Sequence, residues 1–143
     1  MGAAREHVER GIELWNNAEF EELLKQWAPD GVEVNPVGTL TGTKAIGDNY
    51  RRLRAGYPDL HIETLNWAEV GDTVVVEGEL TGTHRALLTL TDGSQLPPTG
   101  QRITFRLASV FQLRDGKTVT LRTYYDQLPM MMQLGLVAPT RQP

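Results

Sequence analysis

The sequence predicts an α+β domain in which N-terminal helices pack inside a curved, mostly antiparallel sheet. Apolar residues recur at helical spacing near the N-terminus, and long segments of alternating apolar and polar residues fill the C-terminal half. The dipeptide Asp115-Gly116 joins the last two of these segments in the manner of a β-hairpin. Helices followed by a run of strands are typical of α+β proteins. A hairpin of this length, placed after an N-terminal helical half, is what a curled, cone-shaped sheet with one deep pocket requires.

Two helices in an elbow are expected between Ala3 and Trp27, where Val8, Ile12 and Trp15 begin a helical apolar stripe. Asn17 interrupts the period and is expected to cap the second helix. The turn signal Pro29-Asp30-Gly31 is followed by a short strand over 32–35. Thr43 is expected to cap a third helix that runs to about residue 55.

Four long strands account for most of the remaining chain. The alternation predicts them over 60–70, 73–84, 102–114 and 117–126. The Thr-, Gly- and Pro-rich stretch Leu87–Gly100 is expected to form a loop over one end of the sheet. A length of 143 residues is typical of one domain, so residues 1–143 are expected to form a single unit.

Composition excludes several function classes. The chain has no cysteine, and its net charge is −4 with acidic and basic residues interspersed, which argues against binding to nucleic acid. No apolar stretch reaches the roughly 18–20 residues that span a bilayer, and the N-terminus lacks a signal peptide, so a cytoplasmic protein is expected. His7 and His61 have no partner at metal-ligand spacing, and the glycines do not form a phosphate-binding loop. We therefore expect neither a metal nor a cofactor.

Several segments carry a family resemblance. They are Leu80-Thr81-Gly82-Thr83-His84, Pro97-Pro98-Thr99-Gly100, Val110-Phe111-Gln112-Leu113-Arg114-Asp115-Gly116-Lys117, and Asp126 followed by Gln133-Leu134-Gly135. With the order of elements, they resemble the SnoaL-like polyketide cyclase or ester cyclase branch of the nuclear transport factor 2-like superfamily. The resemblance implies a cone-shaped fold and cofactor-free acid/base chemistry, of the cyclase or isomerase type, on a hydrophobic oxygenated small molecule. A ligand-binding or accessory protein without catalysis is the alternative.

The resemblance also implies roles for individual residues. An aspartate near the end of the last strand moves a proton in these cyclases, and Asp126 occupies that place. The alternative role for Asp126 is to cap the turn that follows. Gln112 stands where such cyclases offer a histidine. Thr123 stands at one aspartate of the Asp-Arg-Asp set of limonene epoxide hydrolases, which makes epoxide hydrolysis the less favoured chemistry.

The register of the last hairpin decides which side chains share a face. A two-residue turn places Asp126 opposite Phe105, whereas a three-residue loop with a bulge pairs Leu113 with Lys117. The second register is favoured because it separates polar from apolar residues. Its polar face holds Arg106, Gln112, Arg122, Tyr124 and Asp126, and its apolar face holds Ile103, Phe105, Leu107, Phe111, Val119, Leu121 and Tyr125. The pattern leaves open which face is concave.

The candidate site combines two catalytic residues with a set of substrate contacts. Asp126 is the expected proton carrier. Arg106 would hold an enolate oxygen or a substrate carboxylate if it lies inside, and would be a solvated or interface arginine if it lies outside. Residues 130–132 resemble either a lid or a packed plug. The expected substrate contacts are Trp15, Asn35, Tyr50, His84, Gln112, Tyr124 and Met131. A sheet with two covered faces also predicts a homodimer.

Overall fold

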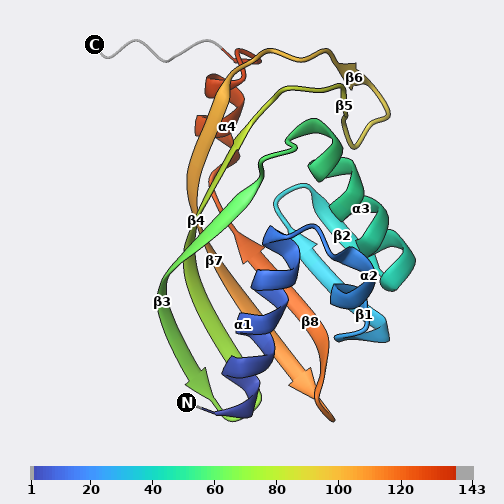
Figure 1. Cartoon of the computed structure of the whole chain (residues 1–143), viewed down its shortest axis with the longest axis vertical. Helices are drawn as coiled ribbons and strands as arrows, with labels where there is room; N and C mark the ends of the chain where they lie inside the picture. Colours follow the sequence, from blue (N-terminus) through green and yellow to red (C-terminus); the bar gives the residue numbers. More distant parts are fainter. Residues whose placement is uncertain (1, 138–143) are drawn as a thin grey trace.

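A computed structural model describes residues 2–137 and shows helices packed against one face of a twisted sheet (Figure 1). The helices are α1 (Ala3–Asn16), α2 (Phe20–Leu24), α3 (Thr43–Gly56) and α4 (Gln127–Gln133). The strands are β1 (Trp27–Asn35), β2 (Gly38–Thr41), β3 (His61–Val70), β4 (Thr73–Thr83), β5 (Leu88–Thr89), β6 (Gln95–Leu96), β7 (Arg102–Arg114) and β8 (Lys117–Tyr124). The α+β class and the cone predicted from the sequence are confirmed.

The main sheet has six strands in the order β2-β1-β8-β7-β4-β3. Neighbouring strands are antiparallel except β1 and β8, which are parallel. Helices α1, α2 and α3 cover the concave face (Figure 1), and three apolar clusters fill the space between the two layers. The helices close the concave face into a container, whose walls come from β1, β4, β7 and β8.

The N-terminal half differs from the sequence prediction in its boundaries. Asn17 ends α1 instead of starting α2, because the chain turns at Ala18, whose φ is +56°. Strand β1 begins at Trp27, and the predicted turn at 29–31 is an irregularity within it, between the pairs Trp27↔Thr118 and Val32↔Thr120. Thr43 is already helical, and the cap is Gly42, which has a φ of +88°. Strand β2 was not predicted.

The long hairpin combines features of both registers considered above. Arg114 pairs with Lys117 across a two-residue turn, in which Asp115 and Gly116 have φ values of +51° and +75°. Left-handed conformations at both positions are typical of a type I′ turn. Leu113 then pairs with Thr118, but the next residue, Gln112, pairs with Thr120, so Val119 is an extra residue in β8. This bulge restores the predicted separation of faces beyond it, but Thr118 lines the cavity where Val119 was expected, and the three-residue loop was wrong.

A strap formed by residues 84–101 crosses one end of the sheet, and α4 lies at the same end (Figure 1). The strap carries the two-stranded β5-β6 hairpin and extends the β4-β7 pairing, because His84 N donates to Gln101 O and Gly100 N donates to His84 O. The end of α3 packs against it so closely that a Cβ at Gly56 would lie 2.7 Å from Leu88. The loop predicted for this stretch is therefore confirmed, with a short hairpin inside it.

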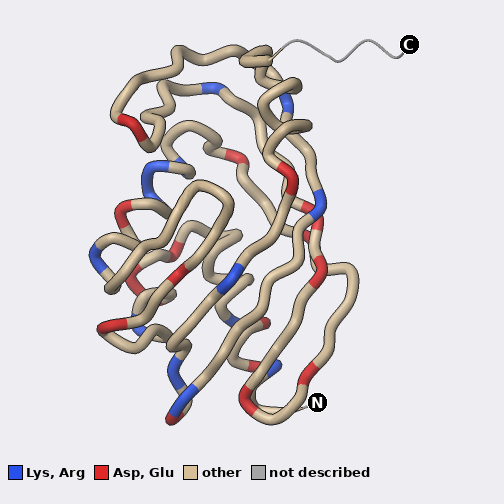
Figure 2. Tube along the Cα trace, turned by 180° about the vertical axis from the view of Figure 1, so that it is seen from behind, with Lys and Arg blue, Asp and Glu red and all other residues tan. Residues whose placement is uncertain are grey.

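Charged residues are distributed over the surface without a continuous basic stripe (Figure 2). Their ion pairs are mostly between neighbours on one helix, such as Arg5 with Glu9 and Lys44 with Asp48. Exposed pairs of this kind contribute little to stability. Among residues 2–137, no helix is both long and apolar enough to cross a membrane.

Candidate functional site

The container between the helices and the sheet encloses a cavity of about 450 Å³. This volume lies within the range of roughly 300–1,000 Å³ that is typical of small-molecule sites. The apolar side chains that face it come from every layer of the fold, and they include Val8, Trp15, Leu80, Phe105, Leu121 and Met130. A small number of polar groups interrupt this lining, and they determine what the cavity can do chemically.

Glu33 is the buried carboxyl group of the cavity wall. It lies in the middle of β1, beside Leu121 of β8, and only 6% of its surface is exposed. The hydroxyl of Tyr50, on α3, donates to Glu33 Oε1 over 3.3 Å. Asn35 is on the same side of β1 and also lines the cavity. Its amide oxygen accepts from Val37 N, which leaves its NH2 group free to turn toward Glu33.

Burial raises the pKa of the Glu33 carboxyl from 4.5 to about 7. Hydrogen bonds from Tyr50 and Asn35 favour the charged form and offset part of this effect. Burial, with the negative charge of Glu33 second, raises the pKa of Tyr50 well above its usual value. Tyr50 therefore keeps its proton, while Glu33 exchanges its own near neutral pH, which is the condition for an effective general acid/base.

Two further polar pairs line the cavity. Ser109 of β7 and Thr123 of β8 face each other across the hairpin, with their hydroxyl oxygens 3.0 Å apart. His7 of α1 and Thr118 of β8 form the second pair, with 3.0 Å between His7 Nε2 and Thr118 Oγ1. Burial, followed by the charge of Lys117, lowers the pKa of His7, so this histidine is neutral at physiological pH.

Four of the predicted substrate contacts line the cavity: Trp15, Asn35, Tyr50 and Met131. His84 does not. Its side chain is fully buried under the strap, where Nδ1 accepts from Thr99 N and lies 2.9 Å from Thr99 Oγ1. Tyr124 is 57% exposed and lies beside a separate shallow depression next to Asn35.

Asp126, Arg106 and Gln112 do not reach the cavity. Asp126 is exposed and caps α4, since its carboxylate accepts from Leu128 N at 3.0 Å. Arg106 lies on the convex face with a side chain that is 78% exposed, 3.7 Å from Glu79. Gln112 accepts from Thr73 Oγ1 near the end of β7. The polar residues predicted to share one face of the hairpin therefore lie on its convex side. The apolar residues that alternate with them along the strands, such as Phe105 and Leu121, line the cavity on the concave side.

The sequence contained one indirect indication that Glu33 and Asn35 act together. The segment Val-Glu-Val-Asn places Glu33 and Asn35 on one side of a strand, opposite the two valines. Alternation of this kind normally indicates a solvated polar face, so it predicts an exposed Glu33. Glu33 is instead buried, because α3 covers this part of β1 with Tyr50. Within residues 2–137, no cluster of three or more His, Cys, Asp or Glu could hold a metal ion.

Comparison with known proteins identifies the family of the chain. The SnoaL-like domain family matches residues 8–121, so the chain belongs to the SnoaL-like family. Its cone is the nuclear transport factor 2-like fold, which is also called ketosteroid isomerase-like. The curated proteins contain no match to this sequence.

Solved structures of this fold resemble the chain over nearly its whole length at low identity. A candidate SnoaL-like polyketide cyclase from Jannaschia sp. CCS1 aligns with a TM-score of 0.82 and 23% identity, covering 96% of this chain and 94% of the other. AclR, a candidate hydroxylase from Streptomyces galilaeus, aligns with a TM-score of 0.81 and 22% identity, covering 97% of this chain and 85% of AclR. TerC, co-crystallised with polyporic acid, aligns with a TM-score of 0.74 and 18% identity, covering 94% of this chain and 99% of TerC.

Burial of Glu33 predicts that stability falls as pH rises from about 4.5 to 7. In this window the folded protein retains a proton that the unfolded chain has released, so each rise in pH favours unfolding. The lowered pKa values of His7 and His84 act in the opposite direction, so the effect is isolated by comparison with Glu33→Gln. Relative to this variant, the wild type should lose about 3 kcal/mol of unfolding free energy between pH 4.5 and 8 in urea titrations.

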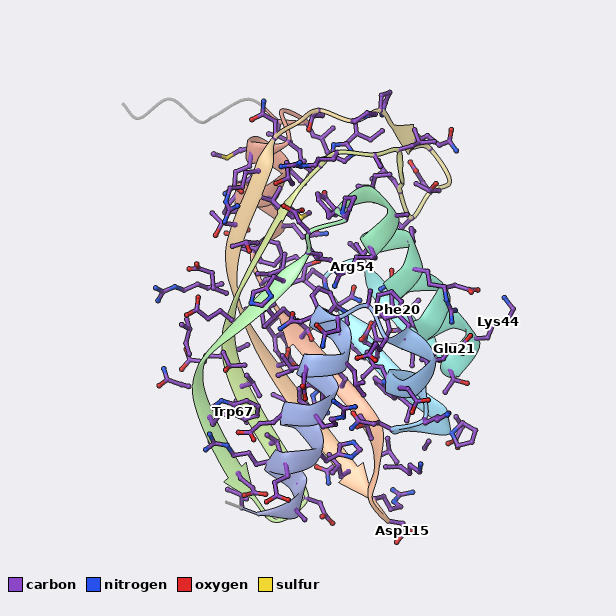
Figure 3. The ribbon with its side chains drawn as sticks, viewed as in Figure 1. Phe20, Glu21, Lys44, Arg54, Trp67 and Asp115 are labelled. Atoms are coloured by element: carbon purple, nitrogen blue, oxygen red, sulfur yellow. The ribbon has the colours of Figure 1, made fainter. Side chains whose placement is uncertain are left out.

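The exposed Glu21 of α2 offers a matched control (Figure 3). Glu21→Gln also removes one carboxylate, and it should follow the wild type much more closely across the same pH range. Parallel pH curves for the wild type and Glu33→Gln would contradict the burial of an ionisable group at this position.

Proposed function

We propose that this protein binds a hydrophobic, oxygenated small molecule in the cavity and catalyses cofactor-free proton transfer of the cyclase or isomerase type, with Glu33 as the proton carrier. The observation that supports this most strongly is a buried carboxyl group with a pKa of about 7 in the wall of a predominantly apolar cavity. Membership of the SnoaL-like family and the small molecule bound in the TerC crystals agree with a ligand site.

The proposed step is the transfer of a proton between a C–H group next to a carbonyl and Glu33. The ionised carboxylate takes the proton, and the C–H bonding electrons form an enolate. The protonated Glu33 then returns the proton at the same carbon, or at the γ-carbon where a C=C bond extends the enolate to a dienolate. If the enolate carbon instead attacks a second carbonyl of the same molecule, a C–C bond closes a ring, and the alkoxide formed from that carbonyl takes the proton from Glu33. Hydrogen-bond donors such as the hydroxyls of Ser109 and Thr123 would stabilise the enolate oxygen.

Glu33 replaces Asp126 in this proposal because of where the two carboxylates lie. Asp126 was expected to carry the proton by its position in the family, but its carboxylate faces solvent and accepts from Leu128 N. A capping carboxylate of this kind contributes about 1 kcal/mol to stability. Arg106 likewise faces away from the cavity, so we assign it no role in the reaction.

The two carboxylates can be separated by exchange of α-protons in D2O, followed by ¹H NMR. Suitable probes are 2-tetralone and ethyl acetoacetate, which are enolisable and need no cyclisation to give a signal. Glu33→Gln should lower the protein-catalysed exchange rate by about a hundredfold or more, since that is the usual contribution of a positioned acid/base. Asp126→Asn should leave both the rate and the unfolding free energy nearly unchanged, since asparagine caps a helix about as well as aspartate.

Two outcomes would contradict the proposal. If Glu33→Gln exchanged protons at the wild-type rate, Glu33 would have no part in the chemistry. If the wild type bound these probes without accelerating exchange, the protein would instead be a binding protein of the same fold. Melting temperatures of both variants must be recorded on the same samples, so that loss of fold is not mistaken for loss of catalysis.

We also propose that the protein is a homodimer through the convex face of the sheet. Helices cover only the concave face, and the convex face exposes Tyr124 and Arg106. Sedimentation velocity at micromolar concentration should give the mass of a dimer, and Tyr124→Glu should shift it toward the monomer because it buries a charge at the interface. A monomeric wild type under these conditions would contradict this assignment.

A further inference from the structure

Arg52 is a positively charged side chain in the wall of an apolar cavity. It projects from α3, is half-buried and lines the cavity. Its Nη1 donates to Thr89 O at 2.7 Å in the strap, and its Nη2 donates to Asn49 Oδ1 at 2.8 Å. A guanidinium has five N–H donors, so these two bonds leave three without a partner among the described residues.

No carboxylate among residues 2–137 forms an ion pair with Arg52. Asp48 lies one helical turn away, but its carboxylate pairs with Lys44. Asp92, which lines the cavity from the strap, accepts instead from the backbone and hydroxyl of Ser94. Arg52 is therefore a partly desolvated cation held in place by two neutral acceptors. Such a group gains most from an anionic partner when one arrives.

Two tyrosine hydroxyls accompany Arg52. Tyr57 and Tyr125 line the cavity, and neither hydroxyl has a hydrogen-bond partner among the described residues. The Tyr57 side chain is buried, with 3% of its surface exposed, and Tyr125 is partly buried. Both lie within electrostatic range of Arg52, so their O–H groups add donors beside its N–H donors.

Tyr125 lies close enough to both Arg52 and Glu33 to be influenced by the charge of each. Burial raises the pKa of Tyr125, and the charges of Arg52 and Glu33 are its next influences, in opposite directions. Tyr125 is thus within electrostatic range of both groups. Its ring stacks on Phe105 with 4.6 Å between centroids, and both rings belong to the apolar lining of the cavity.

We propose that the cavity takes ligands in which an apolar body carries an anionic oxygen group, and that Arg52 binds this group with the help of Tyr57 and Tyr125. This inference deepens the proposed function, because it names a substrate class in which the anionic end lies at Arg52 and the reacting carbon lies at Glu33. It concerns equilibrium binding, whereas the proposed function concerns a rate. Anion binding at Arg52 can therefore fail while proton transfer at Glu33 holds, and proton transfer can fail while anion binding holds.

Two dyes with the same ring system test the inference directly. Both 8-anilinonaphthalene-1-sulfonate and N-phenyl-1-naphthylamine fluoresce in apolar sites, and they differ by the anionic sulfonate. Arg52→Gln should weaken binding of the sulfonate dye about tenfold or more, since a hydrogen bond to a charged group is worth roughly 1.5–3 kcal/mol. Binding of the neutral dye should change by less than about twofold. Arg52→Lys should retain part of the affinity for the sulfonate dye.

Displacement of the neutral dye extends the test to a carboxylate. The probes are 2-naphthylacetic acid and its methyl ester, and only the acid should lose affinity in Arg52→Gln. Arg51→Gln is the matched control, because Arg51 is exposed on the same helix and does not line the cavity. Equal losses for the charged and neutral members of each pair would show that Arg52 only holds the strap through Thr89. Unchanged affinity for both would also overturn the inference.

Discussion

The cavity depends on one constraint in the sheet, the alternation of side chains along the β7-β8 hairpin. One residue too many or too few in either strand would exchange the two faces of that strand, since successive side chains point to opposite sides. The type I′ turn at Asp115-Gly116 alone would place the two strands out of phase. The bulge at Val119 corrects this, so that Leu107 and Phe111 of β7 and Leu121 of β8 line the cavity on the helix side.

The same constraint determines which polar groups are inside. With the hairpin in this phase, Ser109 and Thr123 meet across the strands on the concave face. Leu121 then lies beside Glu33, because β1 runs parallel to β8. The container is closed on the other side by α1 and α3. Arg54 ties these helices together by donating to Trp15 O at 2.6 Å, and it lies between them in Figure 3. The tip of the hairpin at Asp115 projects away from this region.

Burial of the Glu33 carboxyl group lowers the stability of the folded state, and other interactions in the structure must offset this loss. A carboxyl group in an apolar wall favours its neutral form, and among the described residues Tyr50 and Asn35 are placed to stabilise the charged one. Groups of this kind cluster at functional sites because catalysis requires a proton that moves near working pH. The half-buried Arg52 has a similar character, since two neutral oxygens replace its hydration only in part. Both features indicate a wall arranged for a ligand.

Much of the fold could be predicted because its signals are periodic. The boundaries of the long strands were predicted to within about two residues, and the two faces of the hairpin were separated correctly except at Val119. The position of the bulge could not be predicted, because Thr118 and Val119 both suit a strand. The concave face could not be identified either, so Arg106 was placed in the candidate site. Glu33 was missed because burial of a carboxyl contradicts the usual meaning of alternation.

Direct titration of Glu33 tests the central claim most directly. Protein labelled with ¹³C at the glutamate side-chain carboxyl gives one resonance per glutamate, and Glu33→Gln identifies the resonance of Glu33 by its disappearance. That resonance should titrate with a midpoint near pH 7. A midpoint close to 4.5, the ordinary value for a glutamate, would contradict both the buried carboxyl and its role as the proton carrier.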